Sequence, residues 1–152
     1  LGVMYYTGQG VEQSYERAFH WLSQAADQGH LNSMFNLATM YYNGQGVNSA
    51  LMQIWPLSLI SRRQNLQDAA NWYQEAAEYE HAGAQYNLAT MYEAGEGVEQ
   101  DLILAYVWAR LARDNEANGA AALVNRIESA MTPAQLEQAQ RDYARWVLSF
   151  RN

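Results

Sequence analysis

The apolar residues of this chain fall at helical spacing in short stretches that end in glycines. Ala84, Leu88 and Tyr92 lie four residues apart, which places them on one face of a predicted helix. Gly95 and Gly97 follow, and glycine at the end of a helix adopts the left-handed backbone conformation without steric cost. The pattern therefore predicts a helix that ends at a Gly-x-Gly turn.

A second helix is predicted directly after this turn. Asp101 stands at the N-cap position, where its carboxylate can accept hydrogen bonds from the first amides of a helix. Ala105, Trp108 and Ala112 then form another apolar stripe at helical spacing. Two amphipathic helices of this length do not bury their apolar faces alone, so the pattern predicts helix pairs that stack on one another.

The two-helix pattern occurs three times with a period of 36 residues. The recurring Leu, Tyr, Gly, Gly and Val stand at positions 1, 5, 8, 10 and 11, again at 37, 41, 44, 46 and 47, and again at 88, 92, 95, 97 and 98. The last shift is 51 because 15 additional residues interrupt the second unit. The predicted units are residues 1–30, residues 31–81 with an insert at 49–63, and residues 82–117, followed by a C-terminal cap at 118–152.

The pattern is incomplete at both ends of the chain. The first unit lacks the beginning of its first helix, so we expect that the chain is truncated at its N-terminus. Residues 118–131 predict one further helix, and Thr132, Pro133 and Gln135 form a capping box that opens the last one.

The repeat resembles the Sel1-like repeat (SLR), a relative of the tetratricopeptide repeat. The signature of that family is Ala-x3-Leu-Gly-x2-Tyr-x2-Gly-x-Gly-Val-x2-Asp-x3-Ala-x2-Trp-x3-Ala-Ala. Residues 82–113 match it, with Ala89 in place of the helix glycine and Arg113 in place of the last alanine. Ser14 and Asn65 stand at its Asp position in the first two units, where both can cap a helix.

The resemblance implies an all-α fold, a right-handed α-α superhelical solenoid of stacked helix-turn-helix repeats with a C-terminal capping helix pair. It also implies a non-enzymatic scaffold that binds a protein or peptide partner in its concave groove. Regulatory, envelope-assembly and host-interaction roles in bacteria are all typical of the family, and a periplasmic or secreted location is favoured. A self-assembling module that uses the insert as its contact is one alternative, and a hydrolase is a weaker one.

Composition excludes several classes of chemistry. The chain has 152 residues and a net charge of −7, its nine basic residues are all arginine, and it has no cysteine. It therefore has no thiol nucleophile, no disulfide, no Cys-based zinc site and no lysine for a Schiff base. An acidic chain lacks the basic surface that nucleic acid needs, and no apolar run approaches the roughly 20 residues of a membrane span.

The histidines give no consistent catalytic or metal site. His30 and His81 stand at the same turn between units, which explains them as repeat positions. His20 has Glu16 one turn before it, whereas a catalytic zinc site needs three protein ligands. We therefore expect no catalytic residues, no metal and no cofactor.

The tryptophans of the repeat are expected in the core. Trp21, Trp72 and Trp108 recur at the same position of each unit and in phase with the alanine stripe. A stacking platform for a ligand is the functional interpretation, but recurrence at helical spacing favours packing between helices.

The face of each first helix opposite the core is the predicted partner-binding surface. Relative to Leu37, the side chains that point away at 100° per residue are polar, and those predicted to contact a partner are Asn32, Asn36, Thr39, Asn43, Asn87 and Thr90. The Asn and Thr recur between units, although packing is not expected to require them. Amides in a groove suit an extended peptide backbone because they offer donors and acceptors. The alternative, weighted equally, is that these are neutral surface residues with no role in binding. The first helices carry no arginine, so a clamp for a carboxylate is not expected.

The insert Ser49–Arg63 is apolar and basic at a turn where polar residues are the rule. It contains eight apolar residues, no acid, and two arginines at its end. Such a segment packs on its own array or contacts another protein or another copy, and own-array packing or self-association is favoured over a heteromeric site. The predicted contact residues are Trp55, Leu57, Leu59 and Ile60. Pro56 is expected to separate a short helix from a lengthened second helix.

Overall fold

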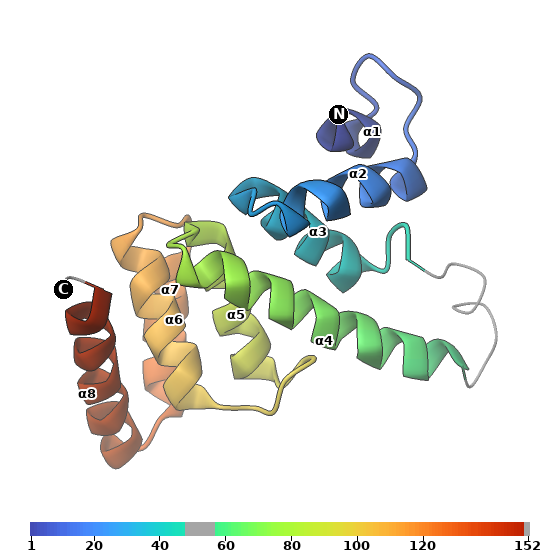
Figure 1. The fold of residues 1–152 in the computed structure, drawn as a ribbon. Coiled ribbons are helices and arrows are strands. Elements are labelled where there is room, and N and C mark those ends of the chain that lie inside the picture. Colours follow the sequence, from blue (N-terminus) through green and yellow to red (C-terminus); the bar gives the residue numbers. More distant parts are fainter. Residues whose placement is uncertain (48–56, 151–152) are drawn as a thin grey trace.

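The computed structural model describes residues 1–47 and 57–150, and this part of the chain is all-helical (Figure 1). The helices of the described residues are α1 Gly2–Thr7, α2 Tyr15–Asp27, α3 Leu31–Asn43, α4 Leu57–Glu78, α5 Ala82–Ala94, α6 Leu102–Asp114, α7 Ala120–Ala130 and α8 Pro133–Phe150. Each helix from α1 to α6 packs on the next one along the chain, and α8 packs on α6. The predicted all-α array of stacked helix pairs is confirmed.

Alanines at the same position of each repeat allow the helices to approach closely. Ala18, Ala69 and Ala105 are completely buried, and each lies in the second helix of its unit. Leu37 and Leu88 fill the corresponding place in α3 and α5 and are at most 1% exposed. The recurrence of small and large residues at fixed positions therefore corresponds to a core that continues from one unit to the next.

The second glycine of the Gly-x-Gly turn is required by contact between units. Gly46 and Gly97 have φ of +73° and +71°, a backbone conformation that residues with a side chain rarely adopt. A Cβ atom on Gly46 would overlap the carbonyl oxygen of Tyr15 at the start of α2, and one on Gly97 would overlap that of Leu66 in α4. Each turn thus lies directly against the second helix of the preceding unit.

Helix caps agree with the sequence prediction in the first and third units and disagree in the second. The Ser14 hydroxyl accepts a hydrogen bond from the Arg17 amide at 3.3 Å, and Asp101 Oδ1 accepts from the Ile103 amide at 2.8 Å. The prediction that Asn65 caps the second helix of its unit is wrong. The last insert residues are helical, so α4 begins at Leu57 and Asn65 lies inside it, buried.

The C-terminal helices form as expected. α7 lies within the predicted segment 118–131, and α8 begins at Pro133. The Thr132 amide donates to Gln135 Oε1 at 2.9 Å and the Gln135 amide donates to the Thr132 hydroxyl at 3.3 Å, which is the predicted capping box. The lengthened second helix expected after Pro56 is also present, whereas the prediction of a short helix before Pro56 falls outside the described residues.

The prediction that all three tryptophans are core residues holds only for Trp108. Its ring is 4% exposed and packs edge-on against Trp146 of α8, with ring centroids 4.9 Å apart. Trp72 is half-buried, and Trp21 is 41% exposed. The three tryptophans have the same helical phase, so their rings lie on the same face of the second helix of each unit. α8 covers this face of α6, whereas α2 packs on α1 and α3, which leave Trp21 exposed.

Candidate functional site

Three of the predicted groove residues meet at a small hollow between α3 and α5. The hollow has a volume of about 190 Å³, and its lining residues are Thr39, Tyr42, Tyr73, Asn87, Thr90 and Met91. Thr39 and Tyr42 come from α3, Asn87 and Thr90 from α5, and Tyr73 from α4. The site therefore exists only when two consecutive units are packed together.

Tyr73 is the buried polar group of this hollow. Its side chain is 2% exposed, and its hydroxyl lies 3.0 Å from the Thr39 hydroxyl. Burial raises the pKa of Tyr73, and hydrogen bonds with Thr39 and Asn87 act in the opposite direction. The prediction that packing does not require these groove residues is therefore wrong for Thr39, whose hydroxyl satisfies a buried phenol.

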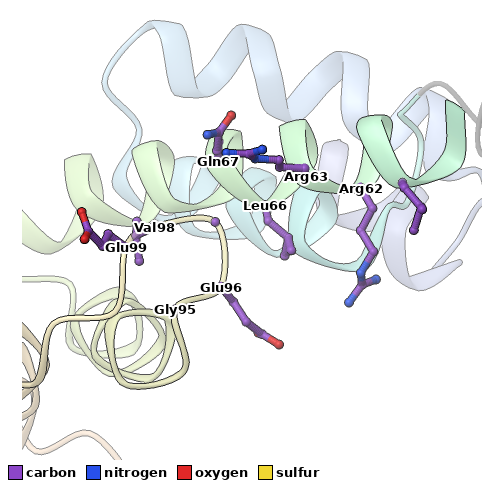
Figure 2. Close-up of a pocket in the computed structure, with 10 residues that line it drawn as sticks. Arg62, Arg63, Leu66, Gln67, Gly95, Glu96, Val98 and Glu99 are labelled. Atoms are coloured by element: carbon purple, nitrogen blue, oxygen red, sulfur yellow. The ribbon is translucent and has the colours of Figure 1, made fainter. Parts of the chain in front are cut away.

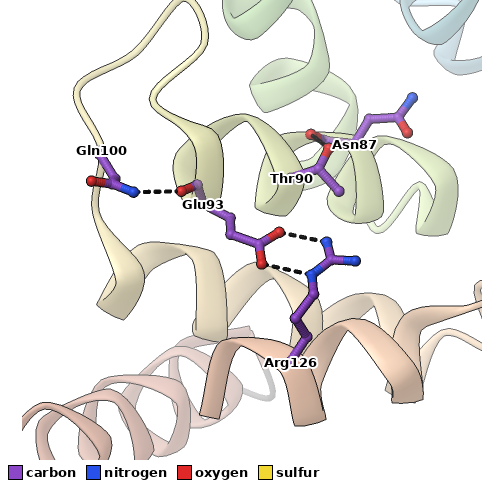
Figure 3. Close-up of polar contacts among 5 residues, drawn as sticks. All are labelled: Asn87, Thr90, Glu93, Gln100 and Arg126. Atoms are coloured by element: carbon purple, nitrogen blue, oxygen red, sulfur yellow. Dashed lines mark hydrogen bonds and ion pairs between the residues drawn. The ribbon is translucent and has the colours of Figure 1, made fainter. Parts of the chain in front are cut away.

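The remaining predicted groove residues lie beside the hollow and do not line it. Asn32 and Asn43 are exposed and Asn36 is half-buried, all on α3. Thr90, which does line the hollow, donates its hydroxyl to the Asn87 carbonyl at 2.7 Å and is therefore bonded within its own helix (Figure 3). A polar face thus extends along α3 on either side of the hollow, and its role in binding a partner stays a prediction.

Hydrogen bonds at equivalent positions join consecutive units at the edge of this face. Tyr6 donates to Gln45 Oε1 at 3.3 Å, and Tyr42 donates to Glu96 Oε2 at 2.6 Å. The bond to Glu96, together with burial, raises the pKa of Tyr42. We did not predict these contacts, but the recurrence of Tyr at one position and Gln or Glu within the turn is a signal that the sequence contains.

In the third unit an ion pair replaces the tyrosine contact. Glu93 occupies the repeat position of Tyr42 and accepts hydrogen bonds from Arg126 Nε at 2.7 Å and Arg126 Nη2 at 2.5 Å (Figure 3). Gln100 donates to the Glu93 carbonyl at 2.8 Å, so the turn before α6 is fixed to the same residue. The two N–H groups of Arg126 that face Glu93 are thus both hydrogen-bonded to its carboxylate. The helices α1, α3 and α5 themselves carry no arginine.

Four residues of the insert are exposed, namely Leu59, Ile60, Arg62 and Arg63. Leu59 and Ile60 are 59% and 65% exposed, so the expectation that the insert packs on its own array is wrong for these two side chains. Leu59, Arg62 and Arg63 line a hollow of about 540 Å³ together with the turn 95–99 (Figure 2). Trp55 lies outside the described residues, and Leu57 is the first residue of α4.

The histidines have structural surroundings. His81 is the N-cap of α5, its Nδ1 accepts from the Ala84 amide at 3.1 Å, and its ring stacks on Phe35 with centroids 4.5 Å apart. Burial lowers the pKa of His81. His20 lies 3.2 Å from the Gln24 amide nitrogen on the surface of α2. In the part of the chain that the structure describes, no group of three or more His, Cys, Asp or Glu could hold a metal ion.

Over residues 1–47 and 57–150, no helix combines the length and apolar character that crossing a bilayer requires.

Comparison with known proteins places the chain in a family. The Sel1 repeat model matches residues 1–30, 31–49, 60–78 and 82–116. The fold is similar to a crystal structure of a Sel1 repeat protein from Oxalobacter formigenes, with 32% identity and a TM-score of 0.68 over 81% of this chain and 44% of that one. It is also similar to a protective antigen of uropathogenic Escherichia coli strains that displays an SLR fold, with 26% identity and a TM-score of 0.53 over 97% of this chain and 36% of that one.

The chain thus spans less than half the length of either protein. No curated protein sequence matches it. Four family matches cover most of the residues, and they fall on the helix pairs that the structure stacks into one array. The chain belongs to the Sel1 repeat family.

Proposed function

We propose that the protein is a non-enzymatic scaffold that binds an extended segment of a partner protein across α3 and α5. The observation that carries this proposal is the meeting of Thr39, Asn87 and Thr90 with two tyrosines and Met91 at the 190 Å³ hollow. Side chains from two units contribute, so the surface depends on the stacking that defines the family. The bound segment would cross the two helices at the hollow.

The chemistry of the surface favours a main chain with a small apolar side chain. Asn36 and Asn87 are half-buried and carry both donors and acceptors, which suits the amides and carbonyls of an extended peptide. The rings of Tyr42 and Tyr73 and the thioether of Met91 supply an apolar lining for one small side chain. The exposed Asn32 and Asn43 extend the polar contact along α3.

Charge argues against recognition of a free C-terminus. A carboxylate clamp needs cationic donors, and α1, α3 and α5 have none. Arg126, at the end of the same face, is bound by Glu93 through two hydrogen bonds. The proposed partner segment is therefore internal to its protein.

A selected peptide tests this proposal while the partner is unidentified. A displayed peptide library is selected on the wild-type protein, and the Kd of each enriched peptide is measured for the variants Thr90→Arg and Ser149→Arg. Thr90→Arg places a long cationic side chain in the hollow. Ser149→Arg is the matched control, because Ser149 also donates to a carbonyl three residues earlier, at 2.8 Å, but on α8.

We expect Thr90→Arg to weaken binding by at least about tenfold, or about 1.4 kcal/mol, with no change for Ser149→Arg. Amidation of the peptide C-terminus should have no effect. Enriched peptides that bind both variants equally well, or that need a free carboxylate, contradict the proposal.

A further inference from the structure

The first turns of α4 form a surface that is apolar and basic, on a chain whose net charge is −7. We name it the basic end and define it as Leu59, Ile60, Arg62 and Arg63. All four residues are exposed, and this end of α4 projects beyond α3 and α5 (Figure 1). Within the described residues, neither arginine makes an ion pair or a hydrogen bond, since the ion pairs there involve other arginines.

A surface of the opposite character lies near the other end of α4. This acidic hollow has a volume of about 690 Å³, and its lining residues are Ala26, Asp27, Gly29, Leu31, Met34, Trp72, Glu75 and Tyr79. Its floor is apolar, because Ala26 and Met34 are buried and Trp72 is half-buried. Its rim carries the exposed carboxylates of Asp27 and Glu75.

The equivalent position one unit further along is lined by a helix. There, a hollow of about 410 Å³ contains Ala77 and Gln85 in the places that Ala26 and Met34 occupy in the acidic hollow. The side chains that α8 contributes to its lining are Tyr143, Trp146 and Val147. This position of the repeat is therefore suited to receive the side of a helix.

We propose that the basic end of one copy docks in the acidic hollow of a second copy. Leu59 and Ile60 would contact the apolar floor, and the two arginines would face Asp27 and Glu75. Opposite charge and matching apolar character favour this pairing, because a mismatch in either would leave charges or apolar area without compensation. The contact uses a different face from the groove of α3 and α5, so it does not depend on the function proposed above.

The geometry of α4 requires that the contact is between molecules. Ile60 and Trp72 lie on the same straight helix, 12 residues apart, and a rise of 1.5 Å per residue separates them by about 18 Å. The basic end therefore does not reach the hollow of its own chain. Because the two surfaces differ, two copies joined at one contact still present one unoccupied surface of each kind, so further copies can join head to tail.

Complementation between two variants tests this arrangement. Ile60→Glu disables the basic end and keeps the acidic hollow, whereas Glu75→Arg reverses a charge of the hollow and keeps the basic end. Leu148→Glu is the control, since Leu148 lies on α8 and is 64% exposed, close to the 65% of Ile60. Molar mass is measured by light scattering from about 10 to 500 µM, a range that detects the weak association expected of a small surface. Circular dichroism verifies that each variant is folded.

We expect the mass of the wild type and of Leu148→Glu to rise with concentration beyond that of a dimer. Each disabled variant alone should remain at 17.2 kDa, and an equimolar mixture of the two should form a dimer and nothing larger. Raising the salt concentration about tenfold should weaken the wild-type association several-fold, because exposed charges are screened. A monomeric wild type, a mixture that stays monomeric, or a Glu75→Arg variant that still associates each overturns the proposal.

Discussion

The second helices of the second and third units, α4 and α6, follow the same repeat pattern and differ in how they begin and in what covers them. α6 begins after the Asp101 cap, and its Trp108 is buried under α8. α4 begins in the insert without a cap at Asn65, and its Trp72 is half-buried. The alanines Ala69 and Ala105 are nevertheless equally buried. Small residues at the closest approach thus maintain the repeat, whereas caps and large aromatic residues depend on what lies next to each unit.

The strongest test of this comparison is the removal of the tryptophans one at a time. Trp108→Ala should lower the free energy of unfolding by about 3–5 kcal/mol, because it leaves a cavity beneath α8. Trp72→Ala should have a smaller effect, and Trp21→Ala should have an effect on the order of 1 kcal/mol. Chemical denaturation measures all three. Equal losses for Trp108→Ala and Trp21→Ala would show that burial by α8 is not the difference.

The turn before α6 gives the next largest effect. Gly97→Ala should destabilise by about 1–2 kcal/mol through its positive φ and by about 1–3 kcal/mol more through overlap with the Leu66 carbonyl of α4. Gly10→Ala is the control, because Gly10 has φ of +75° but its nearest neighbour is the Met4 terminal methyl at 3.5 Å. If thermal denaturation gives the same loss for both, the inter-unit contact contributes nothing.

The cap of α6 should contribute less than either. Asp101→Ala removes the acceptor for two amides and should lower stability by about 1 kcal/mol. Asp101→Asn retains an acceptor of the same shape and should be within a few tenths of a kcal/mol of the wild type. Denaturation midpoints of the two variants separate capping from other effects. If Asp101→Asn loses as much stability as Asp101→Ala, the negative charge of Asp101 and not its capping hydrogen bonds is responsible.

Deletion of residues 49–63 should have the smallest effect on stability. The described apolar residues of the insert at Leu59 and Ile60 are exposed, and the change in loop closure amounts to about 1 kcal/mol or less. In the shortened chain Asn65 directly follows the turn. It should therefore become the N-cap of the shortened α4, as Asp101 is the N-cap of α6. Asn65→Ala should then cost about 1 kcal/mol in the deleted protein, measured by denaturation. A deleted protein that no longer unfolds cooperatively would show that the insert supports the array.

The period of the sequence was sufficient to predict the helix pairs and the caps at Ser14 and Asp101, and Pro56 was sufficient to predict the lengthened α4. It was not sufficient to predict the exposure of Trp21, because helical phase indicates which face a side chain is on but not whether another helix covers that face. The hollow was predicted in part: Thr39 and Asn87 recur, but Tyr73 belongs to a second helix and reaches the hollow only when α4 packs on α3.

The links between units at the groove edge differ in kind along the array, and this gives the molecule a direction. Tyr6 with Gln45 and Tyr42 with Glu96 are joined by hydroxyl groups, whereas Glu93 with Arg126 is joined by opposite charges. Since each link connects only neighbouring units, the loss of one link loosens only the pair that it joins. Dissolved ions screen the Glu93–Arg126 pair and leave the link from Tyr6 unchanged. Higher ionic strength therefore weakens the contact of α7 with α5 and leaves the contact of α1 with the turn after α3 unchanged.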